Sequence, residues 1–123
     1  MNTTTHKGNE LEKRFVRFAA SIVALSSELP STLQGRHISS QILRSGTGSA
    51  ANYGEARGAE SRADFVHKLK IVYKELCETT IWLELIAESS ALSTENIDAI
   101  IAENRELCRI VAASIKTARA ALE

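Results

Sequence analysis

The stretch SGTGSAANYGEARGAESRADF, from Ser45 to Phe65, decides how this chain folds. Four of the six glycines lie in it: Gly46, Gly48, Gly54 and Gly58. A glycine-rich phosphate loop should follow a strand and carry a lysine near its end. Here the glycines continue a helical pattern, and neither a GK[ST] nor a GxGxxG motif occurs. We therefore interpret the stretch as a helix face of small residues, which lets a neighbouring helix approach closely although each glycine lowers helix propensity.

The other segments carry apolar residues in alternating steps of four and three, which is the helical period. The first seam comprises Leu11, Phe15, Phe18, Ile22, Leu25 and Leu29. The third comprises Phe65, Leu69, Val72, Leu76, Thr79, Leu83 and Ile86, and the fourth Ile97, Ile101, Asn104, Cys108, Val111, Ile115, Ala118 and Leu122. The second changes from large to small along Ile38, Ile42, Ser45 and Ser49. This spacing is typical of nearly antiparallel packed helices.

The pattern predicts an all-α fold, an antiparallel up-down-up-down four-helix bundle, because short links force neighbouring helices to run antiparallel. The predicted helices cover residues 10–28, 32–57, 61–89 and 94–121. Residues 1–9 are polar and are expected to form a mobile tail before the bundle at 10–123. Predicted helix starts are the capping box Ser31 with Gln34, then Ser61 with Asp64, then Ser93 with Glu95 and Asp98.

The charges balance overall but not along the chain. Lysine plus arginine number 15 and aspartate plus glutamate number 15, which argues against a general polyanion binder. Residues 1–35 carry a net charge of +1, residues 36–74 of +4 and residues 75–123 of −5. Because the chain has neither a signal-like segment nor an apolar run of ~18 residues, we expect a soluble cytoplasmic protein without a membrane partner. Cys77 and Cys108 fit no metal or redox spacing and are expected to be reduced thiols.

Two blocks of the sequence resemble motifs of a known family. Gln41-Ile42, Arg44 and the run Ser49–Ala56 resemble Q-x-x-R…S-I-x-x-N-I-x-E-G. Ser61–Phe65 and Lys74–Thr79 resemble R-x-S-x-x-D/E-F…S-x-x-E-L-E-T. These patterns are those of the bacterial four helix bundle protein family, also described as the 23S rRNA intervening-sequence protein family, which is similar to the accessory protein of diversity-generating retroelements. The resemblance implies an antiparallel four-helix bundle, a ring-shaped homopentamer and nucleic-acid binding. The chain departs from the pattern at Ala50, Ala56 and Tyr73-Lys74. These departures affect the expected packing of the second helix on the third.

The seams leave a surplus of apolar residues, which lie on the first helix at Val16, Ala20 and Val23, on the third at Val66, Tyr73, Cys77, Ile81, Trp82 and Leu85, and on the fourth at Ile100, Leu107 and Ile110. One interpretation is a wider intramolecular core. The other is a subunit interface, because an exposed apolar surface of this size marks an interaction site. With the resemblance counted, we favour an oligomer interface formed by Val66, Tyr73, Ile81, Trp82 and Leu85, with Trp82 as its anchor.

Basic residues of the second and third helices are the candidate nucleic-acid site. His67, Lys70 and Lys74 form one stripe, and Arg36, Arg44, Arg57 and Arg62 extend it. A closed ring would repeat such a patch by symmetry, and binding to phosphates would be independent of sequence and sensitive to salt. The alternative is a solvated helix face without a partner.

Polar residues on the second and third helices predict a buried network. Asn52 falls on the seam, Glu55 lies three residues later, and a buried polar group needs a partner. We expect Asn52 and Glu55 to meet partners among Tyr73, Lys74, Glu75 and Glu78 on the third helix, with Glu75 and Glu78 completing the network.

Enzymatic readings find little support. A di-iron bundle needs two Glu-x-x-His motifs, and the chain offers a single Asp64-x-x-His67. Glu75 and Glu78 are more simply explained as ion pairs than as an acid–base pair. The sequence predicts a non-enzymatic homo-oligomer without cofactor, metal or small-molecule substrate, whose partners are itself and RNA or DNA. The alternative function is a purely structural or protein–protein interaction scaffold.

Overall fold

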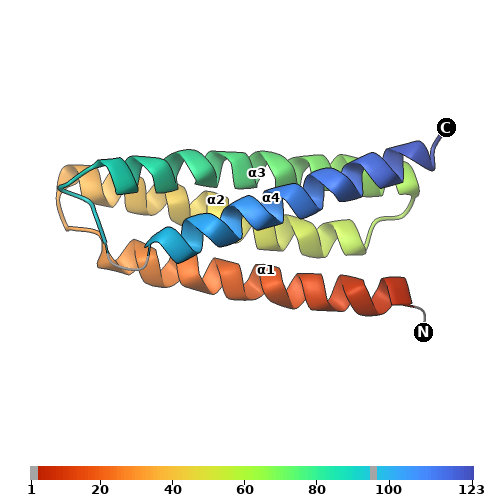
Figure 1. Ribbon diagram of the computed structural model, residues 1–123, viewed down its shortest axis with the longest axis horizontal. Helices are drawn as coiled ribbons and strands as arrows, with labels where there is room; N and C mark the ends of the chain where they lie inside the picture. Colours follow the sequence, from red (N-terminus) through yellow and green to blue (C-terminus); the bar gives the residue numbers. More distant parts are fainter. Residues whose placement is uncertain (1–2, 95–96) are drawn as a thin grey trace.

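The computed structural model describes residues 3–94 and 97–123 and folds them into four helices (Figure 1). They are α1 (Thr3–Glu28), α2 (Leu33–Arg57), α3 (Arg62–Glu88) and α4 (Ile97–Ala120). Each helix runs opposite to the one before it, so that the start of α1, the α2–α3 turn and the end of α4 share one end of the bundle. The predicted all-α four-helix bundle is confirmed, and the described part of the chain contains no strand. None of its helices combines the length and the apolar character that a membrane crossing requires.

Two helices begin at residues other than the predicted ones. α1 begins at Thr3 and not at residue 10, so helix occupies most of the segment expected to be a tail. No proline interrupts these residues, and Gly8 lies in contact range of the Arg57 side chain. The N-cap of α2 is Thr32 and not Ser31: the Thr32 hydroxyl accepts a hydrogen bond from the Gly35 amide at 3.0 Å. A Cβ at Gly35 would lie 1.9 Å from the Pro30 carbonyl oxygen, so the chain turns tightly before α2 begins.

Of the other two predicted helix starts, that of α3 is confirmed and the role of Ser93 before α4 is not. Ser61 caps α3 as predicted, because its hydroxyl accepts a hydrogen bond from the Asp64 amide at 3.1 Å. Ser93 does not act as predicted with its hydroxyl, which donates to the Ser89 carbonyl at 2.7 Å. Glu95, part of the same prediction, lies outside the described residues. α4 is described from Ile97 with Asp98 in its first turn.

The helices follow one another around the bundle. α2 packs against α1 and α3, α4 packs against α3 and less closely against α1, and no close backbone contact joins α1 to α3. The large, fully buried side chains come mainly from the predicted seams, with Phe15, Ile22, Leu69 and Leu76 among them. On α4 the fully buried residues are Asn104, Leu107 and Val111, so Leu107, expected outside the seam, belongs to the core, while its neighbour Cys108 is half-buried. α1 and α3 therefore occupy diagonal corners of the bundle.

The small-residue face of α2 lies where the helices come closest. Ser45 and Ser49 are fully buried, and a Cβ at Gly46 would lie 2.7 Å from Cγ2 of Ile22 on α1. On the other side, the Thr79 hydroxyl of α3 donates to the Ser45 hydroxyl oxygen at 2.8 Å. The interpretation of this stretch as a close-approach helix is confirmed.

Two alanine substitutions in α2 test this packing. Gly46→Ala places a methyl group against Ile22, whose branched side chain is stiff in a helix. Gly54→Ala is the control, because its Cβ would meet nothing nearer than Glu12 Oε1 at 3.9 Å. Both gain the same helix propensity, so we expect Gly46→Ala to be less stable than Gly54→Ala by about 1–3 kcal/mol, the range for overpacking. Urea unfolding measures this difference, and equal stabilities would show that α1 and α2 are not in tight contact.

Candidate nucleic-acid interface

The predicted basic stripe lies on the outer face of α3. His67, Lys70 and Lys74 are all exposed, and Arg62 is exposed at the first residue of the helix. No residue of this group takes part in an ion pair within the described chain. These four residues are the part of the predicted site that stays available to a phosphate.

The three arginines of α2 do not extend this stripe. Arg36 lies near the start of α2, at the opposite end of the bundle from Arg62 (Figure 1), and donates to the Ser31 carbonyl at 2.7 Å. Arg57 turns toward α1, where its Nη1 lies 3.7 Å from Glu12 Oε1. Arg44 reaches Glu75 and Glu78 on α3. The seven residues therefore do not form one continuous patch, because Arg36 lies at the other end of the bundle and Arg44 and Arg57 pair with carboxylates.

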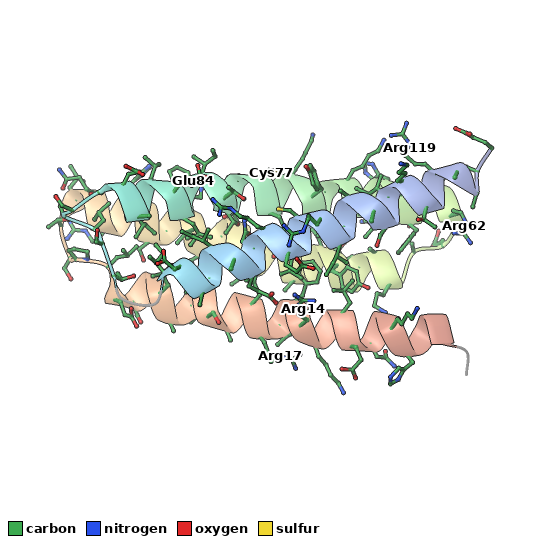
Figure 2. All side chains as sticks on the ribbon, in the orientation of Figure 1. Arg14, Arg17, Arg62, Cys77, Glu84 and Arg119 are labelled. Carbon is green, nitrogen blue, oxygen red and sulfur yellow. The ribbon has the colours of Figure 1, made fainter. Side chains whose placement is uncertain are left out.

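Two residues of α4 that the sequence reasoning missed join the stripe. Asn104 of α4 contacts Leu76 and Thr80 of α3, and the two helices run antiparallel. Lys116 and Arg119, both exposed, therefore lie level with the first turns of α3. Figure 2 shows Arg62 and Arg119 at the same end of the bundle. We call this surface the basic end; it comprises Arg62, His67, Lys70 and Lys74 of α3 with Lys116 and Arg119 of α4.

The two halves of the bundle carry opposite charge. The half with the basic end holds 11 lysines and arginines against 6 carboxylates, and consists of residues 3–15, 46–74 and 109–123. The other half holds 4 lysines and arginines against 8 carboxylates, and consists of residues 16–45, 75–94 and 97–108. A chain with zero net charge thus concentrates positive potential at one end of its long axis, where an anion would be attracted.

Arg44 organises the middle of the α2–α3 contact. Its Nη1 donates to Glu75 Oε2 at 3.3 Å, and its Nη2 donates to Glu78. Nε1 of Trp82 also donates to Glu78 Oε2, at 3.0 Å. The Arg44 hydrogen bond, and after it that of Trp82, lowers the pKa of the Glu78 carboxyl below its ordinary value. Gly48 leaves room for this arrangement, since a Cβ there would lie 2.8 Å from Glu75 Oε2.

The predicted buried network of Asn52, Glu55, Glu75 and Glu78 is wrong in its connections. The Asn52 amide donates to the Gly48 carbonyl of its own helix at 2.9 Å. Glu55 is exposed and accepts from Lys68 at 3.1 Å. Glu75 and Glu78 of α3 pair instead with Arg44, whose long side chain reaches across from α2. The polar pair that is buried between α2 and α3 is Ser45 with Thr79.

Apolar side chains form two exposed strips. The α1 strip consists of Val16, Ala20 and Val23, of which Val16 is 59% exposed. The α3 strip consists of Tyr73, Cys77, Ile81 and Leu85, of which Ile81 is 54% exposed. Because α1 and α3 are diagonal helices, the two strips lie on opposite sides of the bundle.

Two residues of the predicted oligomer interface lie elsewhere than expected. Val66 is only 6% exposed, so the bundle itself already covers it. Trp82 is half-buried beside the core, with its ring edge-on to His37 at 6.1 Å between centroids. Its indole Nε1 donates a hydrogen bond to Glu78 of its own helix at 3.0 Å, and the ring leans on His37 of α2. Tyr73, Ile81 and Leu85 remain exposed, so the available surface is apolar but is not anchored by the tryptophan.

The side chains relevant to catalysis are scattered. Within residues 3–94 and 97–123, no three histidine, cysteine or acidic side chains come together to hold a metal ion. Burial raises the pKa of the Cys108 thiol, which keeps it protonated, and Cys77 stands exposed on α3 (Figure 2). The Cys108 thiol is therefore not an activated nucleophile.

The architecture and these surfaces define a four-helix bundle with one basic end and two apolar strips. The family model of the 23S rRNA-intervening sequence protein matches residues 7–113. The chain therefore belongs to that family, as the motifs of α2 and α3 predicted. A solved structure from Bacteroides thetaiotaomicron, described as a protein with unknown function from the S23 ribosomal protein family, is similar with 38% identity and a TM-score of 0.81. The similarity covers 89% of this chain and 98% of that one. No curated protein matches.

The lowered pKa of Glu78 generates a pH prediction. A carboxyl whose folded pKa is depressed stabilises the fold above its unfolded pKa, here near 4.5, and this stability is lost as pH falls through the folded value. We expect Arg44→Met to be less stable than the wild type at pH 7 by up to about 1 kcal/mol, since the pair is partly exposed. The gap should close as pH falls below 4.5.

Arg105→Met is the matched control, because Arg105 lies 3.9 Å from Glu84 in a longer, more exposed pair. Its effect on stability should be smaller and should change less with pH. Thermal unfolding of the three proteins between pH 3 and pH 7 makes the comparison. A gap between Arg44→Met and the wild type that is constant over this range would contradict the role of Glu78.

Proposed function

We propose that this protein is a non-enzymatic homo-oligomer that binds RNA or DNA through basic ends gathered on one face of a ring. Three observations support it: the two opposed apolar strips, the separation of charge along the bundle, and the family resemblance, which implies a pentameric ring. The two free cysteines fit a reducing compartment such as the cytoplasm.

The position of the strips supports a head-to-tail ring. Self-association through a single patch gives a two-fold dimer, whereas two different patches on opposite sides give a heterologous contact that closes into a ring when the rotation allows it. The α1 strip of one copy would cover the α3 strip of the next. Both strips are largely apolar and exposed in the single chain, so their mutual burial is favourable.

The heights of the two strips also match. Ile22 of α1 packs on Gly46 of α2, whose neighbour Ser45 bonds Thr79 of α3. Residues near 22 on α1 therefore stand level with residues near 79 on α3, which brings the α1 strip to the height of Tyr73, Cys77 and Ile81. If copies stand side by side with parallel axes, the α1 strip of one copy would therefore face the α3 strip of the next with no shift along the axis.

This arrangement would put every basic end on the same face of the ring. Each copy would contribute Lys70 and Lys74 from α3 and Lys116 and Arg119 from α4. Repetition by symmetry multiplies a modest field, and a nucleic acid lying on the face would contact phosphates from several copies at once. Such binding reads no sequence and weakens steeply as salt rises.

The second candidate function is a protein–protein or purely structural scaffold. The apolar strips favour it independently, because they would drive assembly even if the basic end bound nothing. A binding measurement at low salt distinguishes the two functions, because a nucleic-acid-binding protein associates with RNA or DNA there and a scaffold does not.

Single charge insertions test the assembly. We expect Val16→Glu and Ile81→Glu each to reduce the wild-type oligomer to a particle of 13.4 kDa, because each buries a carboxylate in an apolar contact. Leu33→Glu is the control, since Leu33 is 75% exposed at the start of α2 and belongs to neither strip. Size-exclusion chromatography with light scattering gives the masses. A wild type that is monomeric at micromolar concentration, or a Leu33→Glu variant that dissociates equally, would contradict the interface.

Charge reversal tests the nucleic-acid face. Lys70→Glu with Lys74→Glu should abolish binding of RNA and DNA oligonucleotides, and the wild-type affinity should fall steeply with salt. Arg36→Glu with Arg105→Glu makes the same change of charge in the acidic half of the bundle and should leave most of the affinity. Fluorescence anisotropy at several salt concentrations measures both, after light scattering has shown that each variant remains oligomeric. If wild-type protein ignores RNA and DNA at low salt, the scaffold function stands in its place.

A further inference from the structure

A cleft opens between α1 and α4, beside the α2–α3 turn. Its volume is about 880 Å³, which lies within the range of small-molecule binding sites. It forms because α4 packs less closely on α1 than on α3, and in Figure 1 the two helices diverge toward this end of the bundle. The proposed nucleic-acid face shares Arg62 with it but does not use its interior.

The floor of the cleft is apolar and partly aromatic. Its lining includes Leu11, Tyr53, Phe65 and Ile110. The Tyr53 ring is held in place by stacking on Phe15, with 4.8 Å between centroids and 16° between planes. Burial raises the pKa of the Tyr53 phenol, so the side chain offers a neutral ring and a hydroxyl group. A floor of this kind suits a flat, apolar body.

The walls of the cleft are strongly basic. Five cationic side chains line it: Lys7, Arg14, Arg17, Arg57 and Arg62. Three carboxylates offset part of this charge: Glu10 lines the cleft, Glu103 forms two hydrogen bonds of 2.8 Å with Arg14, and Glu12 lies 3.7 Å from Arg57. Two positive charges remain in excess within the cleft.

The first turns of α1 help to shape the basic wall. A Cβ at Gly8 would lie 3.0 Å from Nε of Arg57, so the absence of a side chain at this position leaves room for the guanidinium. Figure 2 shows the Arg14 side chain between α1 and α4 and Arg62 at the end of the bundle. The cations thus come from α1, α2 and α3 and surround the apolar floor.

We propose that this cleft binds a small organic phosphate with an aromatic body, of the size of a nucleoside monophosphate. The body would lie on the floor beside Tyr53 and Phe65, and the phosphate would pair with the guanidinium groups. Guanidinium forks match phosphate oxygens in pairs, and a phosphate dianion balances the two excess charges, whereas a single carboxylate would leave one uncompensated. The cleft shares only Arg62 with the basic end within the described residues, and His67, Lys70 and Lys74 do not line it, so the proposal can be tested apart from nucleic-acid binding.

Isothermal titration calorimetry of the full chain with each of the four ribonucleoside 5′-monophosphates tests the proposal. The matching nucleosides and inorganic phosphate serve as comparators. At least one monophosphate should bind roughly tenfold more tightly than its nucleoside and than phosphate, since it alone uses both floor and cations. If none of the four binds more tightly than inorganic phosphate, the proposal is wrong.

Two matched pairs of variants locate the binding. Ser114→Trp fills the cleft from α4, whereas Ala113→Trp adds the same bulk at the exposed neighbouring position outside it. Arg62→Glu reverses a charge of the cleft, and Arg119→Glu reverses one at the same end that does not line it. The first member of each pair should weaken monophosphate binding roughly tenfold or more, and the second should change it little.

Circular dichroism melting tests whether each variant is folded. If Ser114→Trp does not fold, the comparison of Arg62→Glu with Arg119→Glu alone tests the location of the binding site. Wild-type affinity in a folded Arg62→Glu variant, or an equal loss in the two controls, would overturn the assignment of the cleft. Lys70→Glu with Lys74→Glu should leave monophosphate affinity unchanged while it removes RNA and DNA binding. That contrast separates a failure of the cleft from a failure of the proposed function.

Discussion

The close approach of α2 to both of its neighbours is the constraint on which the rest of the structure depends. Ser45, Gly46 and Ser49 present almost no side-chain volume, so Ile22 of α1 and Thr79 of α3 come against the α2 backbone from two sides. A helix with larger residues there would push its neighbours apart and open the core. The close fit holds α1 and α3 at diagonal corners and fixes their relative height, and the outer faces of both are left uncovered.

Function follows from what these two outer faces carry. The outer face of α3 is basic in its first half, at Lys70 and Lys74, and apolar in its second half, at Ile81 and Leu85. On the far side of the bundle, Val16 and Val23 stand level with Tyr73 and Ile81. In the proposed assembly, one rigid unit combines two docking surfaces with a charged end that docking leaves free. The cleft at that same end adds a basic, concave site inside each copy.

The sequence predicted those features that depend on a single helix. The seams of α1 and α3, the Ser61 cap and the close-packing role of Gly46 could all be derived from local spacing and propensity. Features that depend on the height of one helix against another could not. The reach of Arg44 to Glu78, the arrival of Lys116 and Arg119 beside α3, and the cleft all require the antiparallel register, which no local pattern encodes. Val66 was misassigned because surplus apolar residues were counted as exposed before the crossing of the helices was known.

The central claim, that copies dock head to tail through α1 and α3, is tested most directly by disulfide cross-linking. Cys77 already lies exposed in the α3 strip, and Ala20 stands at the same height on α1. Mild oxidation of an Ala20→Cys variant should yield a ladder of covalent oligomers that ends in a closed ring, while wild-type protein yields none. Covalent dimers alone would indicate a two-fold contact between α3 strips, and an absence of cross-links at micromolar concentration would contradict docking through these strips altogether.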